Sequence, residues 1–173
     1  MDSDKALSEL LAKQAITERL NDYCRAMDRM DDPLGYTVFH PEAPADYGEI
    51  FKGTGHEFVD WVHQSHAPMI STNHKISNVS IRIDGDRAGS ETYVTMHGRI
   101  PGEGDTVMEI HSIGRYLDKW EKRDGEWRIS ERRFLSNMDE VRPVAMSAYP
   151  TEGARDRSDP SYALLGAVEQ APA

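Results

Sequence analysis

The 173-residue sequence contains one cysteine, Cys24, so the chain cannot form an internal disulfide. Cys24 lies among apolar neighbours in a predicted helix, where a small buried hydrophobic residue is a better interpretation than a nucleophile. The first residues also lack the basic and then apolar pattern of a secretory signal. We therefore expect a cytoplasmic protein.

Long hydrophobic runs are absent and basic residues are in deficit. No apolar stretch approaches the roughly 20 residues of a membrane span, so we expect no membrane association. Twenty basic side chains stand against thirty acidic ones, and the net charge of −10 repels nucleic acids and anionic membranes. The hydrophobic fraction of 38% and the charged fraction of 29% are typical of one soluble globular domain.

Several catalytic motifs are missing as well. The only His-x-x-His, formed by His63 and His66, has no second ligand set in the sequence, which argues against a metal. No glycine-rich dinucleotide loop, phosphate loop or Gly-x-Ser-x-Gly elbow is present. We therefore expect no cofactor, and cofactor-free acid–base chemistry or plain binding remains.

The first third of the chain carries helical patterns. Residues 4–30 place apolar side chains at helical spacing, and the helix should end near Pro33 because proline restricts the residue before it. Three shorter elements follow: a helix over 34–39, a strand over 47–52 and a helix over 57–69.

From residue 71 the period changes to two. Four long strands, at about 71–83, 87–99, 106–122 and 126–138, are separated by hairpin turns. Helices followed by an antiparallel meander predict an α+β fold, in which a curved, mostly antiparallel sheet is covered by the N-terminal helices and forms a cone with a pocket at one end. We expect this domain over 1–142 and a turn-rich, poorly periodic tail over 143–173 that covers the pocket or stays loose.

Asp28 occupies an unusual position for a carboxylate, near the end of the first predicted helix. It continues the ridge of Ile16, Leu20 and Cys24, so a helix that buries this ridge points a carboxylate inward at its C-terminal end. Both the helix dipole and burial disfavour a carboxylate there, so a neighbouring group should compensate it. On spacing alone, a solvated acid beside Asp31 is the alternative.

His74 precedes an apolar strand within small polar residues, where it either faces a wet pocket or satisfies a hydrogen bond in the sheet. Its parity differs from that of the row Val79, Ile81 and Ile83, so an inward His74 requires a β-bulge around Ser77 and Asn78 if that row also faces inward. If Asp28 accepts from one ring nitrogen, the other is left as a neutral base.

Three more side chains are candidates for the site. Tyr23 lies near Asp28 on the helix and is either a substrate-binding phenol or a core tyrosine. His111 shares strand parity with Val107 and Ile113, which points it inward, although an ordinary sheet histidine is the alternative. Arg132 offers a cation for an oxyanion, or else a surface salt bridge with Glu131 or Glu121.

Two stretches carry a family resemblance. The run from Ala15 to Asp28, followed by His74 on a strand and by the hairpin from Tyr116 to Trp127, resembles the SnoaL-like part of the nuclear transport factor 2-like superfamily. The likeness covers about residues 5–140. It is closest to the branch that holds scytalone dehydratase, hexachlorocyclohexane dehydrochlorinase and bile acid 7α-dehydratase.

This resemblance implies a cone-shaped α+β barrel that assembles as a homodimer or homotrimer, with Asp28 orienting His74 and His74 removing a carbon-bound proton. Tyr23 falls where relatives place a pocket tyrosine or lysine. Arg132 falls near the dehydrochlorinase's pocket arginine, whereas the bile acid enzyme's arginine aligns closer to Ser136. His111 is comparable, by position, to a second pocket histidine of scytalone dehydratase.

The function predicted is a cofactor-independent lyase, most simply a dehydratase that breaks a carbon–oxygen bond. An apolar pocket would suit a small hydrophobic, aromatic or polycyclic substrate; its expected side chains are Phe39, Phe58, Trp61, Met69, Phe134 and Ser136. Alternatives on the same scaffold are an isomerase, a polyketide-type cyclase and a formaldehyde-releasing aryl lyase. A non-catalytic binding or interaction module is the alternative outside enzymes.

Overall fold

The computed structural model describes residues 3–145 and 151–169, which form four helices and six strands. The helices are α1 (Ser3–Arg29), α2 (Asp32–Val38), α3 (Gly55–His66) and α4 (Pro160–Glu169). The strands are β1 (Pro44–Asp46), β2 (Lys52–Thr54), β3 (Ser71–Asp84), β4 (Arg87–Pro101), β5 (Val107–Arg123) and β6 (Glu126–Val144). Among the described helices, none combines the length and apolar character needed to cross a membrane.

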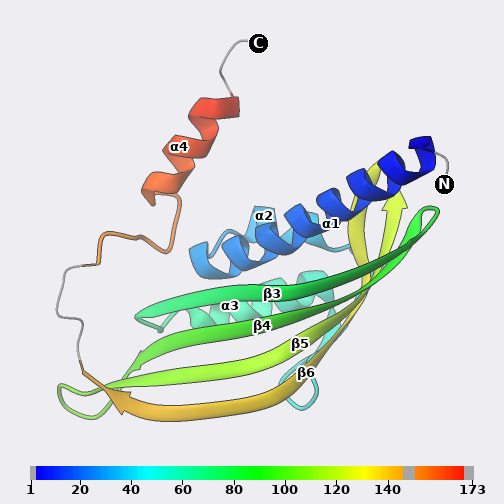
Figure 1. Ribbon diagram of the computed structural model, residues 1–173. Helices are drawn as coiled ribbons and strands as arrows, with labels where there is room; N and C mark the ends of the chain where they lie inside the picture. The colour runs from blue at the N-terminus through cyan, green and yellow to red at the C-terminus, as the bar shows by residue number, and fades with distance from the viewer. Residues whose placement is uncertain (1–2, 146–150, 170–173) are drawn as a thin grey trace.

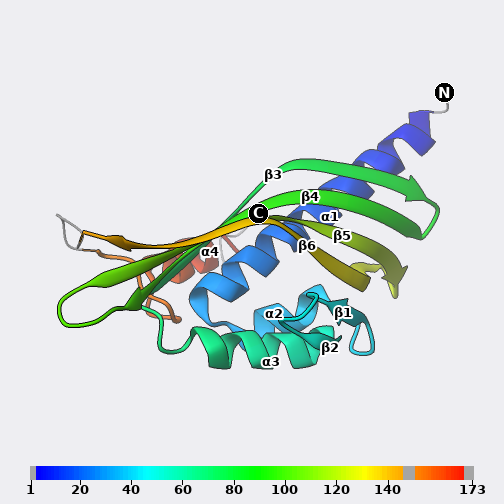
Figure 2. The same ribbon diagram turned by 90° about the horizontal axis from the view of Figure 1, so that it is seen from below.

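The six strands form one curved, unclosed sheet in the order β2-β1-β6-β5-β4-β3. All neighbouring pairs are antiparallel except β1 with β6. The helices α1, α2 and α3 lie on the concave side of this sheet (Figures 1 and 2). The predicted α+β fold with helices packed on a curved sheet is confirmed.

The bulge that an inward His74 requires is present in β3. Ser77 pairs with Tyr93 and Ser80 pairs with Glu91, so two residues of β3 oppose one of β4. Asn78 adopts the left-handed conformation there, with φ of 48°. The extra residue changes the parity of the strand, so His74 and the buried Ile81 both face the helices.

The core lies between α1 and the sheet. The α1 ridge is buried, and Cys24 within it is a buried free cysteine, as predicted. The first turns of α1 project beyond the sheet (Figure 2), which leaves Leu7, Leu10 and Leu11 exposed. Met30, with φ of 53°, terminates the helix just before Asp31.

Several predicted elements differ from those in the structure. The segment 47–52 is mostly the loop between β1 and β2, which pair as a short hairpin. Helix α3 starts two residues earlier than expected because Thr54 and Glu57 form a capping box. The tail contains the helix α4, which was not predicted. Its residues Leu164 and Leu165 are exposed, and its sequence has little of the amphipathic spacing that would indicate a helix.

Candidate active site

Asp28 is a buried carboxylate that accepts three hydrogen bonds from two donors, both supplied by His74. Its Oδ2 accepts the backbone N–H of His74 at 2.8 Å, and Oδ1 accepts the same N–H at 3.1 Å and Nδ1 of the ring at 2.7 Å. The side chains are 8% and 7% exposed, respectively. These bonds offset the free-energy cost of burying the Asp28 carboxylate at the negative end of the helix dipole. The neighbouring group that the sequence predicts for Asp28 is therefore His74.

The contact also determines the state of the imidazole. Because Nδ1 donates to the carboxylate, a neutral His74 has its lone pair on Nε2. His74 pairs with Met96 of β4, and both side chains line one pocket. The arrangement is therefore an oriented base with a carboxylate behind it and a cavity in front.

The pocket has a volume of about 160 Å³ and is mostly aromatic and apolar. Tyr47 stacks face to face on Phe58, with ring centroids 3.8 Å apart. The residues lining the pocket are Tyr23, Tyr47, Ile50, Phe58, Trp61, Val62, His66, His74, Val94, Met96, Ser112, Tyr116 and Phe134.

The predicted pocket residues divide into two groups. Phe58, Trp61 and Phe134 line the pocket, together with Tyr23. Phe39 does not, because it is fully buried in the core, where it bridges to Ile129.

Met69 and Ser136 also lie outside the lining. Met69 lies over Gly98, and its carbonyl is held by Arg155. Ser136 is exposed on β6, one pleat beyond Phe134. Gly114, the partner of Ser136, leaves room for the ring of Phe134, which lines the pocket.

Three phenols form the polar part of the wall. The hydroxyls of Tyr23 and Tyr47 lie 3.0 Å apart, and the ring of Tyr116 meets Tyr23 edge-on at 5.4 Å. Burial raises the pKa of all three well above its usual value, although the nearby Arg132 cation opposes this. They are therefore neutral hydroxyl groups that can donate to a substrate oxygen.

Arg132 lies behind these tyrosines rather than in the lining. Its guanidinium is 4.3 Å from the ring centre of Tyr23 and 4.0 Å from that of Tyr116. Nε and Nη2 bind Asp118 at 2.7 and 2.8 Å, and both side chains are fully buried. The alternative prediction was a surface salt bridge of Arg132 with Glu131 or Glu121. Instead, Glu131 forms an ion pair with Lys119, and Glu121 forms one with Arg123.

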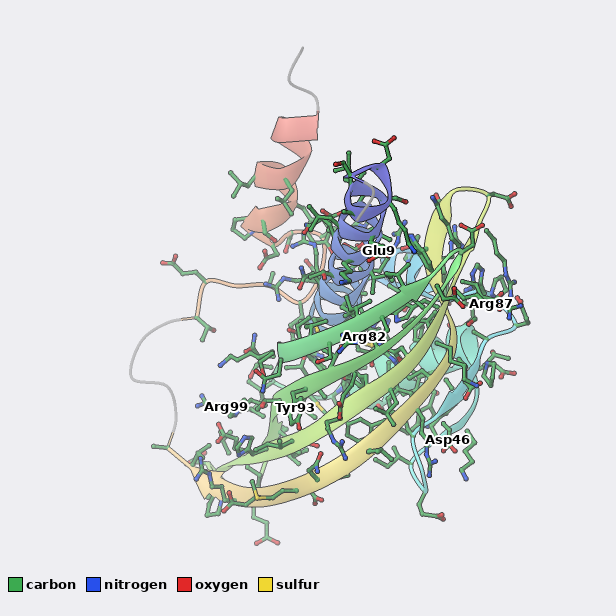
Figure 3. The ribbon with its side chains drawn as sticks, turned by 45° about the vertical axis from the view of Figure 1, so that its right-hand side comes forward. Glu9, Asp46, Arg82, Arg87, Tyr93 and Arg99 are labelled. Atoms are coloured by element: carbon green, nitrogen blue, oxygen red, sulfur yellow. The ribbon has the colours of Figure 1, made fainter. Side chains whose placement is uncertain are left out.

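The predicted inward orientation of His111 is wrong. Ser112 and Tyr116 face the pocket, so by alternation His111 points to the opposite face of the sheet. There it stacks on His97 of β4 at 4.4 Å. Tyr93 and Arg99, labelled in Figure 3, lie on this same outer face of β4. His111 shares its face of β5 with Val107 and Ile113, as predicted, but that face is not the one that the helices cover.

Sequence reasoning missed Tyr47, Tyr116 and His66 as pocket residues. The sequence pattern predicts a strand at Tyr47, and Tyr116 belongs only to the family pattern. His66 belongs only to the His-x-x-His that it forms with His63. Within the described residues, no group of three or more metal-binding side chains occurs.

Known proteins share both the sequence pattern and the fold. Residues 8–133 match the SnoaL-like domain, whereas no curated protein matches the chain. The fold is similar to the crystal structure of a putative scytalone dehydratase from Novosphingobium aromaticivorans, at 20% identity and a TM-score of 0.69, covering 87% of this chain and 96% of that one.

Two further structures are similar. Hexachlorocyclohexane dehydrochlorinase (LinA) type 2 is 22% identical with a TM-score of 0.69, covering 86% of this chain and 99% of that one. A nuclear transport factor 2-like protein from Salmonella enterica is 20% identical with a TM-score of 0.64, covering 83% and 99%. At these identities the likeness establishes the fold. Because the domain match spans most of the sequence, the chain belongs to the SnoaL-like domain family.

Proposed function

We propose that the protein is a cofactor-independent lyase that eliminates water from a small ring-containing substrate. The observation that carries the proposal is the 2.7 Å contact between Asp28 and Nδ1 of His74 at the wall of an aromatic pocket. A binding module has no need for a buried carboxylate that orients an imidazole. The dehydratase and dehydrochlorinase among the similar structures are consistent with this chemistry.

In the proposed reaction, Nε2 of His74 takes a proton from a substrate carbon. The electrons of that C–H bond form a double bond as the adjacent C–O bond breaks, and the imidazolium returns its proton to the departing oxygen, which releases water. Asp28 stabilises the imidazolium while it exists. Tyr23 and Tyr47 share one hydrogen bond, so the hydroxyl that accepts it keeps its own proton to donate to a substrate oxygen.

The cavity favours a substrate of modest size. Ligand pockets typically measure about 300–1,000 Å³, whereas this one measures about 160 Å³. A single substituted ring suits it better than the polycyclic molecules also predicted from the sequence. The isomerase, cyclase and aryl lyase alternatives share the first proton transfer, so the products formed distinguish them from a dehydratase.

The test compares variants on monocyclic β-hydroxy carbonyl compounds, with product formation followed by NMR. His74→Ala should lower turnover by roughly 10²–10⁴-fold, the usual contribution of a general base. Asp28→Asn should lower it by a smaller factor, since the imidazole remains. His111→Ala is the matched control, because it removes an imidazole from the outer face and should leave turnover unchanged. Unaltered turnover in a folded His74→Ala variant would rule out the mechanism.

A further inference from the structure

A second imidazole faces the pocket. His66 is the last residue of α3 and lines the cavity together with His74. The two ring centroids are 6.2 Å apart, with 33° between the ring planes. Because both rings line the same cavity, one substrate can contact both of them at once.

The ring of His66 differs from that of the other buried histidine of α3, because no residue that the structure describes hydrogen-bonds its Nδ1. His63, one turn earlier, uses both nitrogens, with Nδ1 bound to Asp32 and Nε2 to the carbonyl of Ala26 at 3.1 Å. Among the described residues, nothing hydrogen-bonds Nδ1 of His66, although this atom is fully buried. A buried polar atom without a partner costs about 1–3 kcal/mol. Such a group fits a ligand site better than a structural position.

The burial of Nδ1 assigns the tautomer of His66. Orphaned buried N–H donors are rarer in proteins than under-satisfied acceptors. Nδ1 of His66 is therefore the unprotonated atom, and the proton is on Nε2. Nε2–H is then the donor that His66 offers to the pocket that it lines.

The surroundings keep this ring uncharged. Burial lowers the pKa of His66 to about 4, and His74, Arg155 and His63 lower it further, while Asp28 opposes them. Arg155 reaches in from the C-terminal segment and binds the carbonyls of Met69 at 2.6 Å and His66 at 3.0 Å. It thereby holds the end of α3 in place.

We propose that His66 is a second catalytic residue, whose Nε2–H donates a hydrogen bond to a substrate oxygen on the carbon next to the one that His74 deprotonates. This rests on the proposed function and names the substrate class: a small ring compound with a carbonyl beside the acidic carbon. As the proton moves to Nε2 of His74, the electrons of the C–H bond form a double bond to the carbonyl carbon, and the π electrons of the carbonyl move onto its oxygen. When the carbonyl re-forms, the C–O bond on the other neighbouring carbon breaks, and its oxygen takes the proton from His74 and leaves as water. A neutral imidazole stabilises that oxyanion without giving up its proton.

The test uses two probes that differ by one oxygen. 4-Methylphenol is a stable enol analogue, and toluene lacks the hydroxyl. We expect His66→Leu to weaken 4-methylphenol binding about tenfold, the worth of one good hydrogen bond, with toluene affinity unchanged within about twofold. His66→Gln, which keeps an N–H donor, should recover part of the loss. Dissociation constants come from NMR titration.

A second measurement uses the unaltered protein, so its result does not depend on whether the variants fold. The ¹⁵N resonances of His66 should report the Nε2–H tautomer at pH 7, and Nε2 should shift with 4-methylphenol but not with toluene. An unshifted Nε2, or an oxygen preference retained in His66→Leu, overturns the proposal. Neither probe reacts, so turnover that survives His74→Ala would defeat the proposed lyase and leave this binding result intact.

Discussion

At the scale of single residues, each buried charge is matched by a specific partner. Asp28 is compensated by His74, and Arg132 by Asp118 with a bidentate contact. The Arg132 guanidinium also lies over the rings of Tyr23 and Tyr116, which places a cation directly behind the phenols of the pocket. Removing the Asp118 carboxylate would leave the Arg132 cation uncompensated inside the domain.

Asp118→Asn should lower the free energy of unfolding by about 3–5 kcal/mol, because it leaves Arg132 buried without a counter-ion. The matched control is Glu131→Gln, which breaks the ion pair with Lys119 at the adjacent register position. That pair is exposed, so its loss should cost less than about 1 kcal/mol. Urea unfolding measures both values. Similar small losses in the two variants would show that the buried pair contributes no more than a surface pair.

At the scale of elements, the bulge in β3 brings the base to the pocket. Without it, His74 and Ile81 would lie on opposite faces, and either the base or the core would face solvent. Asn78 makes the bulge possible because asparagine tolerates the left-handed conformation that it adopts. A single exposed residue therefore controls the orientation of the catalytic candidate.

Asn78→Val should destabilise the protein by about 1–2 kcal/mol, since a β-branched residue is strained at φ of 48°. Asn78→Gly should be close to neutral, because glycine has no Cβ to clash there. Ser80→Val, two residues on in the same strand and also exposed, controls for the added side chain and should not destabilise. Thermal unfolding followed by circular dichroism distinguishes the three. Equal melting temperatures for the two Asn78 variants would contradict this account.

At the scale of the whole molecule, the C-terminal segment docks beside the site. Asp31, just after α1, accepts from the hydroxyl of Tyr162 at 2.7 Å and from Arg157 at 3.2 Å. Arg25 lies 4.3 Å from the ring centre of Tyr162 and binds Ser161. With Arg155 on the end of α3, these contacts tie the two helix ends that carry Asp28 and His66 to the same segment.

Tyr162→Phe should loosen this segment without unfolding the domain. The lost hydrogen bond is worth about 1 kcal/mol, so amide exchange over 154–162 should rise roughly fivefold while the melting temperature changes little. Hydrogen–deuterium exchange with mass spectrometry measures this. Tyr93→Phe, on the outer face of β4, is the control. Equal exchange in both variants would mean that the Tyr162 hydroxyl does not hold the segment.

Local patterns alone determined the long helix, the four long strands and the need for a bulge, because each depends on the spacing of neighbouring residues. Asp28 and His74 could be paired from the ridge, the strand and a family pattern. The tertiary structure decided the face of His111, the partner of Arg132 and the position of His66 in the pocket wall. These depend on strand register and on which helix end meets which strand, and such long-range contacts leave no mark on the sequence near the residues that make them.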